Sequence, residues 1–150
     1  MTQEDKELLL KDLCARLPYG VMLKHISTEK PFKLFSIKRD EYASYKKDGV
    51  ELAVNGIYYD WYVNDTYHDI ELYIKPYLFP LSSMTEEQKR EYNSLRDFVP
   101  TYHYEYGDIV EDTALYDNFE SIDYLIANHF DYRGLIPMGL AIDATGLNIY

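Results

Sequence analysis

The sequence predicts a single α+β domain with an N-terminal helix, a mostly antiparallel sheet of four to five strands, and two helices in its second half. Apolar residues recur with helical spacing over residues 2–17, alternate with a period of two between residues 21 and 74, and return to helical spacing after residue 83. Strands that precede helices, instead of alternating with them, are typical of this class. We find no internal repeat and no Gly/Ser/Pro linker in the 150 residues, so one domain over residues 1–150 is expected.

The first helix is predicted to begin after Thr2, whose hydroxyl can cap it while Asp5 places negative charge in the first turn. Pro18 and Gly20 end it. Its predicted core-facing stripe consists of residues at positions i, i+3, i+4 and i+7, namely Leu10, Leu13, Cys14 and Leu17. Because Cys14 lies on this stripe, we interpret it as a small buried hydrophobic residue and not as a nucleophile.

Five segments with strand periodicity follow the first helix. The first two, residues 21–26 and 32–37, alternate apolar and polar side chains. The polar residues 39–48 fit either a loop or one helical turn. Asn55-Gly56 then separates two β-rich runs and can supply the positive φ angles of a type I′ turn, so a hairpin is expected there. A last strand is predicted over residues 68–74.

Helical signals dominate the second half. Two overlapping capping boxes, Ser83 with Glu86 and Thr85 with Gln88, precede a helix of about three turns. Its predicted stripe is Tyr92, Leu95 and Val99. A further capping box, Asp117 with Glu120, precedes a second stripe made of Phe119, Ile122, Leu125, Ile126 and His129. The acidic and aromatic residues 101–116 between the two helices have no clear assignment.

Charge and cysteine content restrict the function classes. The net charge of −11 argues against direct binding of nucleic acid, because phosphate contacts depend on lysine and arginine. The single cysteine, Cys14, can form neither an intramolecular disulfide nor a thiolate zinc site, which favours the reducing cytoplasm. The acidic N-terminus does not resemble a secretory signal, and no apolar run reaches the length of a membrane span. We therefore expect a cytoplasmic protein without membrane contact.

Residues 130–144, FDYRGLIPMGLAIDA, contain two glycines at the spacing found in a P-loop. Leu140 and Ala141 stand where that motif needs lysine and a hydroxyl residue, so phosphate binding is not expected. We interpret the stretch as structural: Gly134 ends the preceding helix, Gly139 permits a close approach of a neighbour, and Ile136 and Met138 pack inward. Asp131 and Arg133 are expected to form a charge pair, with Tyr132 half-buried.

No catalytic or metal-binding pattern stands out. The four histidines (His25, His68, His103 and His129) are far apart in the sequence, and none belongs to a ligand motif. The sequence contains no GxSxG motif, and its paired acids are typical of a solvated surface. We predict no cofactor, no metal and no catalytic residue, and the sequence leans away from an enzyme.

Tyrosine is the unusual feature, with 17 in the chain. Its ring covers a large area at low entropic cost and keeps a polar tip, which is why it is frequent in protein interfaces. Cross-strand tyrosine pairs that only cover a small sheet are the alternative explanation. The candidate binding residues lie in two tyrosine-rich segments and are Tyr59, Trp61, Tyr102, Tyr104 and Tyr106.

Three stretches carry a resemblance to known proteins: LLKDLCARLPYGV (residues 9–21), IKPYLFPLSSMTEEQKREY (74–92) and IDYLIANHFDYRGLIPMGLAIDA (122–144). On these stretches the chain resembles an uncharacterised family of small proteins from gut bacterial genomes and their phages and mobile elements. The resemblance implies no activity, cofactor or catalytic residue. The central strands and residues 101–116 look like its variable part, where specific recognition would be located.

Three functional hypotheses follow. The first is a non-enzymatic protein that binds an unidentified protein partner through an acidic, tyrosine-rich surface. The second is an acidic mimic of nucleic acid that blocks a DNA-binding or defence protein, which requires regularly spaced carboxylates on one face. The third is a small enzyme or carbohydrate binder that uses Trp61 and neighbouring tyrosines as a stacking floor in a deep pocket. The sequence does not determine the oligomeric state.

Overall fold

The computed structural model describes residues 2–25, 29–40, 49–54, 57–62 and 74–150. Three α-helices are found in this part of the chain: α1 (Gln3–Arg16), α3 (Glu86–Leu95) and α4 (Phe119–Ala127). Two short 3₁₀ turns, η1 (Leu17–Tyr19) and η2 (Leu81–Ser83), accompany them. The strands are β1 (Met22–His25), β2 (Phe32–Asp40), β3 (Gly49–Val54), β4 (Ile57–Tyr62), β5 (Ile74–Leu78), β6 (Asp97–Glu105), β7 (Asp108–Tyr116) and β8 (Ile142–Asp143).

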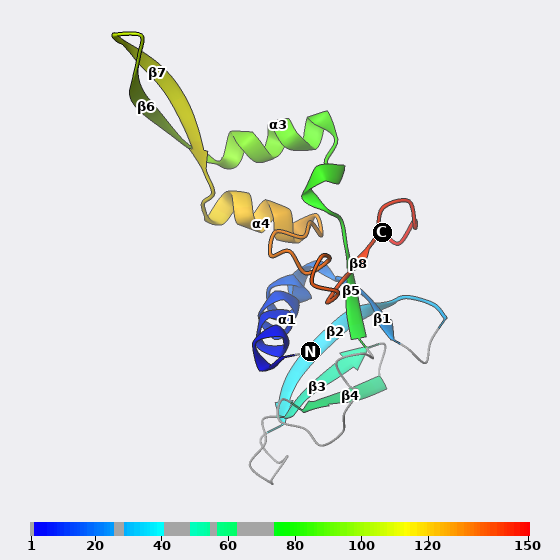
Figure 1. Cartoon of the computed structure of the whole chain (residues 1–150). Coiled ribbons are helices and arrows are strands. Elements are labelled where there is room, and N and C mark those ends of the chain that lie inside the picture. Colours follow the sequence, from blue (N-terminus) through cyan, green and yellow to red (C-terminus); the bar gives the residue numbers. More distant parts are fainter. Residues whose placement is uncertain (1, 26–28, 41–48, 55–56, 63–73) are drawn as a thin grey trace.

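The larger sheet has six strands in the order β4-β3-β2-β1-β5-β8 (Figure 1). Every neighbouring pair is antiparallel except β5 and the two-residue β8, which run parallel. Val54 pairs with Ile57, so β3 and β4 form the expected hairpin with two residues between them. The turn Asn55-Gly56 itself, and most of the predicted strand over residues 68–74, lie outside the described residues. The predicted α+β class with a mostly antiparallel sheet is confirmed.

Two groups of buried apolar side chains form the core of the described residues. The larger one packs α1 and residues 135–141 against the sheet, with these buried members: Leu9, Leu13, Val21, Leu23, Phe32, Leu34, Ile74, Leu78, Leu135, Leu140 and Ala141. The second lies around α3 and α4 and is centred on Met84, Leu125 and Phe130. Burial of this apolar surface is the main favourable free energy of folding.

Helix α1 begins as predicted but faces the core differently. Thr2 and Asp5 form a reciprocal capping box, with N···O distances of 3.1 and 2.9 Å. The buried stripe, however, is Leu9, Asp12, Leu13 and Arg16, whereas Cys14 is exposed, so the expectation of a buried cysteine is wrong. The reason is that two charged residues occupy the core-facing stripe. Apolar periodicity alone therefore placed the stripe about one residue too far along the helix.

The two charged residues of α1 form what we call the junction, a buried polar cluster that joins α1 to the segment after α4. Arg16 donates to the carboxylate of Asp12 at 2.7 and 3.2 Å, and both side chains are fully buried. Arg16 also donates to the backbone carbonyls of Phe130 at 2.7 Å and of Ile126 at 3.4 Å. Arg133 approaches Asp12 to 3.4 Å. Both carbonyls also accept a backbone N–H, from His129 and Tyr132 respectively, so the guanidinium of Arg16 adds a second, charged donor to each.

The helices of the second half differ in detail from their predicted limits. Thr85 and Gln88 form the predicted capping box of α3, but Ser83 belongs to η2 and caps no helix. Helix α3 ends at Leu95, and Val99 lies in β6. The N-cap of α4 is Asn118, paired with Ser121, in place of the predicted Asp117 and Glu120. Asn118 also donates to the carbonyl of Leu95, which selects it over its acidic neighbour.

Two residues predicted for the apolar stripe of the last helix take other positions. Phe119 is 96% exposed and does not face the core. His129 lies beyond the end of α4 and adopts a left-handed conformation with φ of 61°. The helix has already ended at Ala127, with Asn128 as its C-cap. His129 therefore makes the reversal that the sequence predicts at Gly134.

Residues 130–144 form a structural segment as expected, but through other contacts. Asp131 accepts hydrogen bonds from the backbone N–H groups of Leu135 and Ile136, both at 2.8 Å, while Arg133 pairs with Asp12 instead. Gly134 and Gly139 both have φ of 74°. No atom lies within 4 Å of a Cβ built on Gly139, so its conformation and not a close approach requires glycine. Tyr132 is half-buried as expected, but Met138 is exposed.

Candidate binding surface

Residues 97–116, unassigned from sequence for the most part, form a long two-stranded hairpin. Strands β6 and β7 pair over nine residues each, from Asp97 opposite Tyr116 to Glu105 opposite Asp108. Tyr106 and Gly107 connect them, with φ of 51° and 88°. Positive φ at both central residues is what a type I′ turn requires, and this turn matches the twist of the flanking strands. The hairpin leaves the end of α3, returns to the start of α4 and projects away from the rest of the molecule (Figure 1).

The register divides the hairpin into two chemically different faces, because directly opposed residues in an antiparallel pair share a face. One face carries Phe98, Tyr102, Tyr104 and Ile109, which we call the aromatic face. The other carries Glu105, Asp108 and Asp112, which we call the acidic face. Between positions 97 and 116 there are five carboxylates and no lysine or arginine. Of the remaining two acids, Asp97 lies on the acidic face and Glu111 on the aromatic face, opposite Tyr102.

The aromatic face is open to solvent along its length. Phe98 is 68% exposed, Tyr102 65%, Tyr104 79% and Ile109 65%. At the tip of the hairpin, Tyr106 is 98% exposed. No residue between 97 and 116 is buried. Four large apolar or aromatic side chains therefore remain in water without a packing partner in the described structure.

The hairpin is held at its base by a polar network that does not involve the aromatic face. Arg96 donates to the carbonyl of Leu115 at 2.9 Å and forms an ion pair with Asp117 at 3.2 Å. Asn118 donates to the carbonyl of Leu95 at 2.7 Å and to Asp97 at 3.0 Å. These bonds orient the two strands relative to α3 and α4, so the direction of the projection is defined while its surface stays free.

Tyr92 completes the base of the hairpin from α3. Its hydroxyl donates to the carboxylate of Asp117, and the guanidinium of Arg96 lies 5.2 Å from the centre of its ring. Burial together with the neighbouring carboxylate raises the pKa of Tyr92 to about 12. The phenol of Tyr92 therefore remains a hydrogen-bond donor throughout the physiological pH range.

The structure separates the two groups of predicted site residues. Tyr102 and Tyr104 lie side by side on the aromatic face, and Tyr106 is at the tip. Tyr59 and Trp61 belong to β4, the outermost strand of the six-stranded sheet, opposite Leu52 and Val50. Figure 1 shows β4 at the end of the molecule opposite to the hairpin. The five residues therefore do not form one site.

Sequence reasoning missed Phe98 and Ile109, which complete the aromatic face. A signal for the hairpin was present, since Tyr106-Gly107 lies between two runs with alternating side chains. It was weak because Tyr-Gly is a less characteristic type I′ dipeptide than Asn-Gly. Val99 and Pro100 were also interpreted as the end of a helix, which concealed the start of β6.

Other site chemistries find little support in the described part of the chain. Among these residues, no three His, Cys, Asp or Glu side chains are grouped so that they could hold a metal ion. None of the described helices is both long and apolar enough to cross a membrane. The acidic face is not a continuous row of carboxylates, because Val110 and Ala114 interrupt it along β7. The side chain of Trp61 lies outside the described residues, so a pocket around it stays a prediction.

No protein-family model matches the chain, and comparison with curated proteins and with solved structures gave no match.

Proposed function

We propose that this protein is a non-enzymatic binding module whose hairpin docks on another protein, at an apolar patch bordered by lysine and arginine side chains. The observation that carries the proposal is the solvent exposure of Phe98, Tyr102, Tyr104 and Ile109 on one face. Exposed aromatic patches of this kind mark interaction sites, and tyrosine is enriched in the centres of interfaces.

The energetics of a two-stranded hairpin support this proposal. A hairpin with no other packing is marginally stable in water, and it gains stability when a third strand or a hydrophobic surface covers one face. Here the ladder is nine pairs long, its connection has suitable φ angles and its base is anchored. A partner would thus meet a surface that is already in its binding conformation, which lowers the entropic cost of association.

Charge complementarity defines the partner. Five carboxylates and no lysine or arginine lie on the hairpin. Two copies facing each other through their hairpins would double this negative charge, so a second copy is a poor occupant. A partner surface that carries lysine and arginine instead attracts the hairpin over a Debye length and aligns it before the aromatic face makes contact. The resemblance to proteins of gut bacteria and their phages makes a cytoplasmic bacterial or phage protein the expected partner.

The test uses photo-crosslinking in bacteria that carry the gene. A photoreactive phenylalanine analogue at position 104 should capture one main partner, whereas the same analogue at position 147, also on an exposed side chain, should not. The captured protein is then purified and its affinity for the full chain measured. Tyr102→Ser with Tyr104→Ser should weaken binding by at least about tenfold, since buried aromatic anchors dominate interface free energies.

The matched control is Leu147→Ser, which removes a half-exposed apolar side chain far from the hairpin and should leave the affinity unchanged. Raising the salt concentration should weaken binding, and neutralising Glu105 and Asp108 to amides should reduce this salt dependence. Equal capture from positions 104 and 147, or unchanged affinity of the double tyrosine variant, would contradict the proposal. Crosslinked dimers of the chain would show that a second copy is the occupant.

A further inference from the structure

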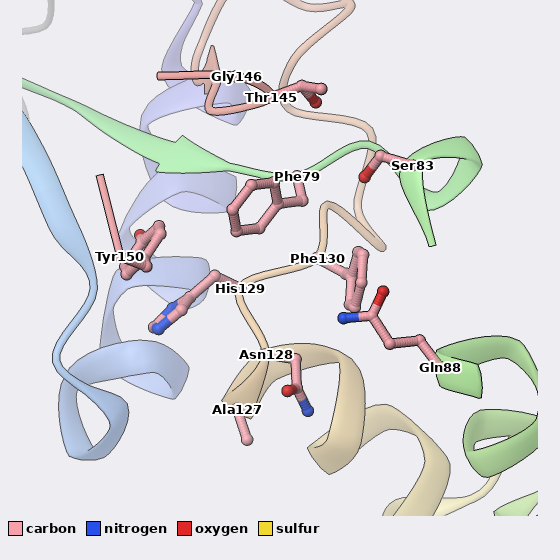
Figure 2. Close-up of a pocket in the computed structure, with 10 residues that line it drawn as sticks. All are labelled: Phe79, Ser83, Gln88, Ala127, Asn128, His129, Phe130, Thr145, Gly146 and Tyr150. Carbon is pink, nitrogen blue, oxygen red and sulfur yellow. The ribbon is translucent and has the colours of Figure 1, made fainter. Parts of the chain in front are cut away.

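A pocket of about 350 Å³ lies at the ends of α3 and α4 away from the hairpin (Figure 2). It is lined by residues from the end of β5, the first turn of α3, the end of α4 and the C-terminal segment. The residues that matter for its chemistry are Phe79, Phe130, Tyr150, Gln88, Asn128 and Thr145. Its size is near the lower end of the range of roughly 300–1,000 Å³ found for ligand pockets, which suits a small molecule.

The lining of this pocket carries no Asp, Glu, Lys or Arg, although these types make up 27% of the chain. An anionic ligand would find no cation in the lining and would also be repelled by the net charge of −11. A cationic ligand would find no carboxylate. Since a charge removed from water without a partner is costly, the lining selects against both.

Aromatic side chains form the walls. The rings of Phe79 and Phe130 are 6.2 Å apart at 55°, and those of Phe79 and Tyr150 are 5.7 Å apart at 49°. His129 stacks on Tyr150 with 3.9 Å between the ring centres and 10° between the planes. Tyr150 is fixed by its hydroxyl, which donates to the carbonyl of Tyr77 and accepts from the N–H of Met22. Such walls suit a flat or ring-shaped ligand.

His129 keeps this wall uncharged. Burial, and to a lesser extent the neighbouring Arg16, lowers its pKa to about 4, so the imidazole is neutral at pH 7. Its Nδ1 atom is buried and has no hydrogen-bond partner, and its backbone has φ of 61°, which is uncommon outside glycine. Backbone strain and unsatisfied polar atoms of this kind are concentrated at functional sites.

Two amide side chains offer one donor and one acceptor to the pocket. The Oε1 atom of Gln88 accepts from the N–H of Thr85 at 2.9 Å, which leaves its Nε2 group to donate. The Nδ2 atom of Asn128 donates to the carbonyl of Tyr124 at 2.9 Å, which leaves its Oδ1 atom to accept. Figure 2 shows both side chains on the same side of the pocket, beside Phe130. Their helix-end bonds fix which atom each amide presents.

We propose that this pocket binds a neutral planar ring that carries neighbouring C=O and N–H groups, that is, a cyclic amide of the nucleobase type such as uracil. The Nε2 group of Gln88 donates to the ring carbonyl, and the Oδ1 atom of Asn128 accepts from the ring N–H. The half-buried ring of Phe79 covers one face of the ligand, and the exposed hydroxyl of Thr145 is available to a substituent. This site is separate from the hairpin and does not depend on the function proposed for it.

The test is a titration of the full ¹⁵N-labelled chain with uridine. The side-chain NH₂ signals of Gln88 and Asn128 should shift saturably at millimolar concentration, together with the backbone signals of Phe79 and Phe130. A probe without the ring N–H, 1,3-dimethyluracil, should bind at least about tenfold more weakly, because it leaves the acceptor of Asn128 without a partner. Uridine monophosphate should also bind more weakly because of its charge.

Gln88→Glu is the decisive variant. A glutamate at this position still accepts the Thr85 N–H and keeps the capping box of α3, but it has no hydrogen-bond donor for the ring carbonyl. It should bind uridine at least about tenfold more weakly while its spectrum shows an intact fold. Asn93→Asp adds the same charge to an exposed position of α3 outside the pocket and should bind as the unchanged chain does. Absent shifts with uridine, equal binding of 1,3-dimethyluracil, or unchanged binding by the Gln88 variant would each overturn the proposal.

Discussion

The junction buries charged side chains, whereas the hairpin exposes aromatic side chains to solvent. In the junction, Asp12 and Arg16 are fully buried, and their charges are matched by each other and by the carbonyls of Ile126 and Phe130. On the hairpin, the aromatic residues are exposed and the carboxylates have no lysine or arginine among them. The polar groups of the junction hold the fold together, whereas the apolar groups of the hairpin contribute little to it. In this protein the residue type alone therefore does not indicate whether a residue serves folding or binding.

The largest expected effect is at the junction. Asp12→Ala leaves the buried guanidinium of Arg16 without its carboxylate, and it also removes the partner of Arg133. Loss of one member of a buried ion pair costs about 3–5 kcal/mol of the free energy of unfolding. Urea denaturation of the full chain measures this loss of free energy. Lys11→Ala, an exposed neighbour on the same helix, should change this free energy by less than about 0.5 kcal/mol.

A second change at the junction distinguishes charge from packing. Asp12→Leu combined with Arg16→Met removes both charges and keeps the side-chain volume. Replacing a buried ion pair by apolar residues of similar volume often leaves the free energy of unfolding unchanged. Here the carbonyls of Ile126 and Phe130 also lose their charged donor and keep only the N–H groups of His129 and Tyr132, so the double variant should remain less stable than the original chain. Full recovery of stability would show that these two carbonyl contacts contribute nothing.

A smaller effect is expected from the protonation of His129, which makes the free energy of unfolding depend on pH. Its pKa in the folded protein is about 4, below the ordinary value of 6.5, so as the pH falls from 6.5 towards 4 the unfolded state takes up the proton first. The free energy of unfolding therefore decreases across this window, and His129 adds no further decrease below it. Because the ring is partly exposed, the loss should be on the order of 1 kcal/mol.

His129→Asn removes the titrating group and keeps a residue that tolerates positive φ. Denaturation of both proteins at several pH values between 4 and 8 gives the difference, in which the shared carboxylates cancel. The difference should be constant above pH 7 and should shift in favour of the variant at lower pH. A constant difference over the whole range would contradict the lowered pKa.

The smallest effect on stability is expected from the aromatic face. Tyr102→Ser with Tyr104→Ser should change the free energy of unfolding by less than about 0.5 kcal/mol per site, because both rings are exposed. Hydrogen exchange of the same proteins should show fast exchange in residues 98–115 and slow exchange around Leu13 and Leu135. A loss of several kcal/mol in the double variant would place these tyrosines in the folding core and remove the contrast with the junction.

How much of the molecule the sequence predicts depends on whether the signal is local. The capping boxes at Thr2 and Thr85 and the hairpin around Asn55-Gly56 involve residues close in the chain, and their helix starts and strand pairing were predicted correctly. The junction was not, since Arg16 meets its carbonyl partners more than 100 residues away. Asp12 and Arg16 look like solvated residues of a surface helix until that distant contact is known.

For the binding surface, the sequence identified the tyrosines but not their arrangement. Tyr102, Tyr104 and Tyr106 were selected because they alternate, and this alternation is the strand periodicity of β6. Phe98 was missed because the apolar residues around it fit a helix equally well. The pocket was missed because Gln88 and Asn128 carry no motif, and their free donor and acceptor are defined only by hydrogen bonds at helix ends.

The base of the hairpin has one more consequence. Asp97 and Tyr116 are directly paired, so the first residue of β6 and the last residue of β7 lie next to each other beside α3 and α4. An insertion whose ends are already adjacent can be shortened, lengthened or replaced without displacing α3 or α4. Related proteins could thus exchange residues 98–115 for sequences that recognise different targets while they keep the same folded body, much as antibody domains change their loops.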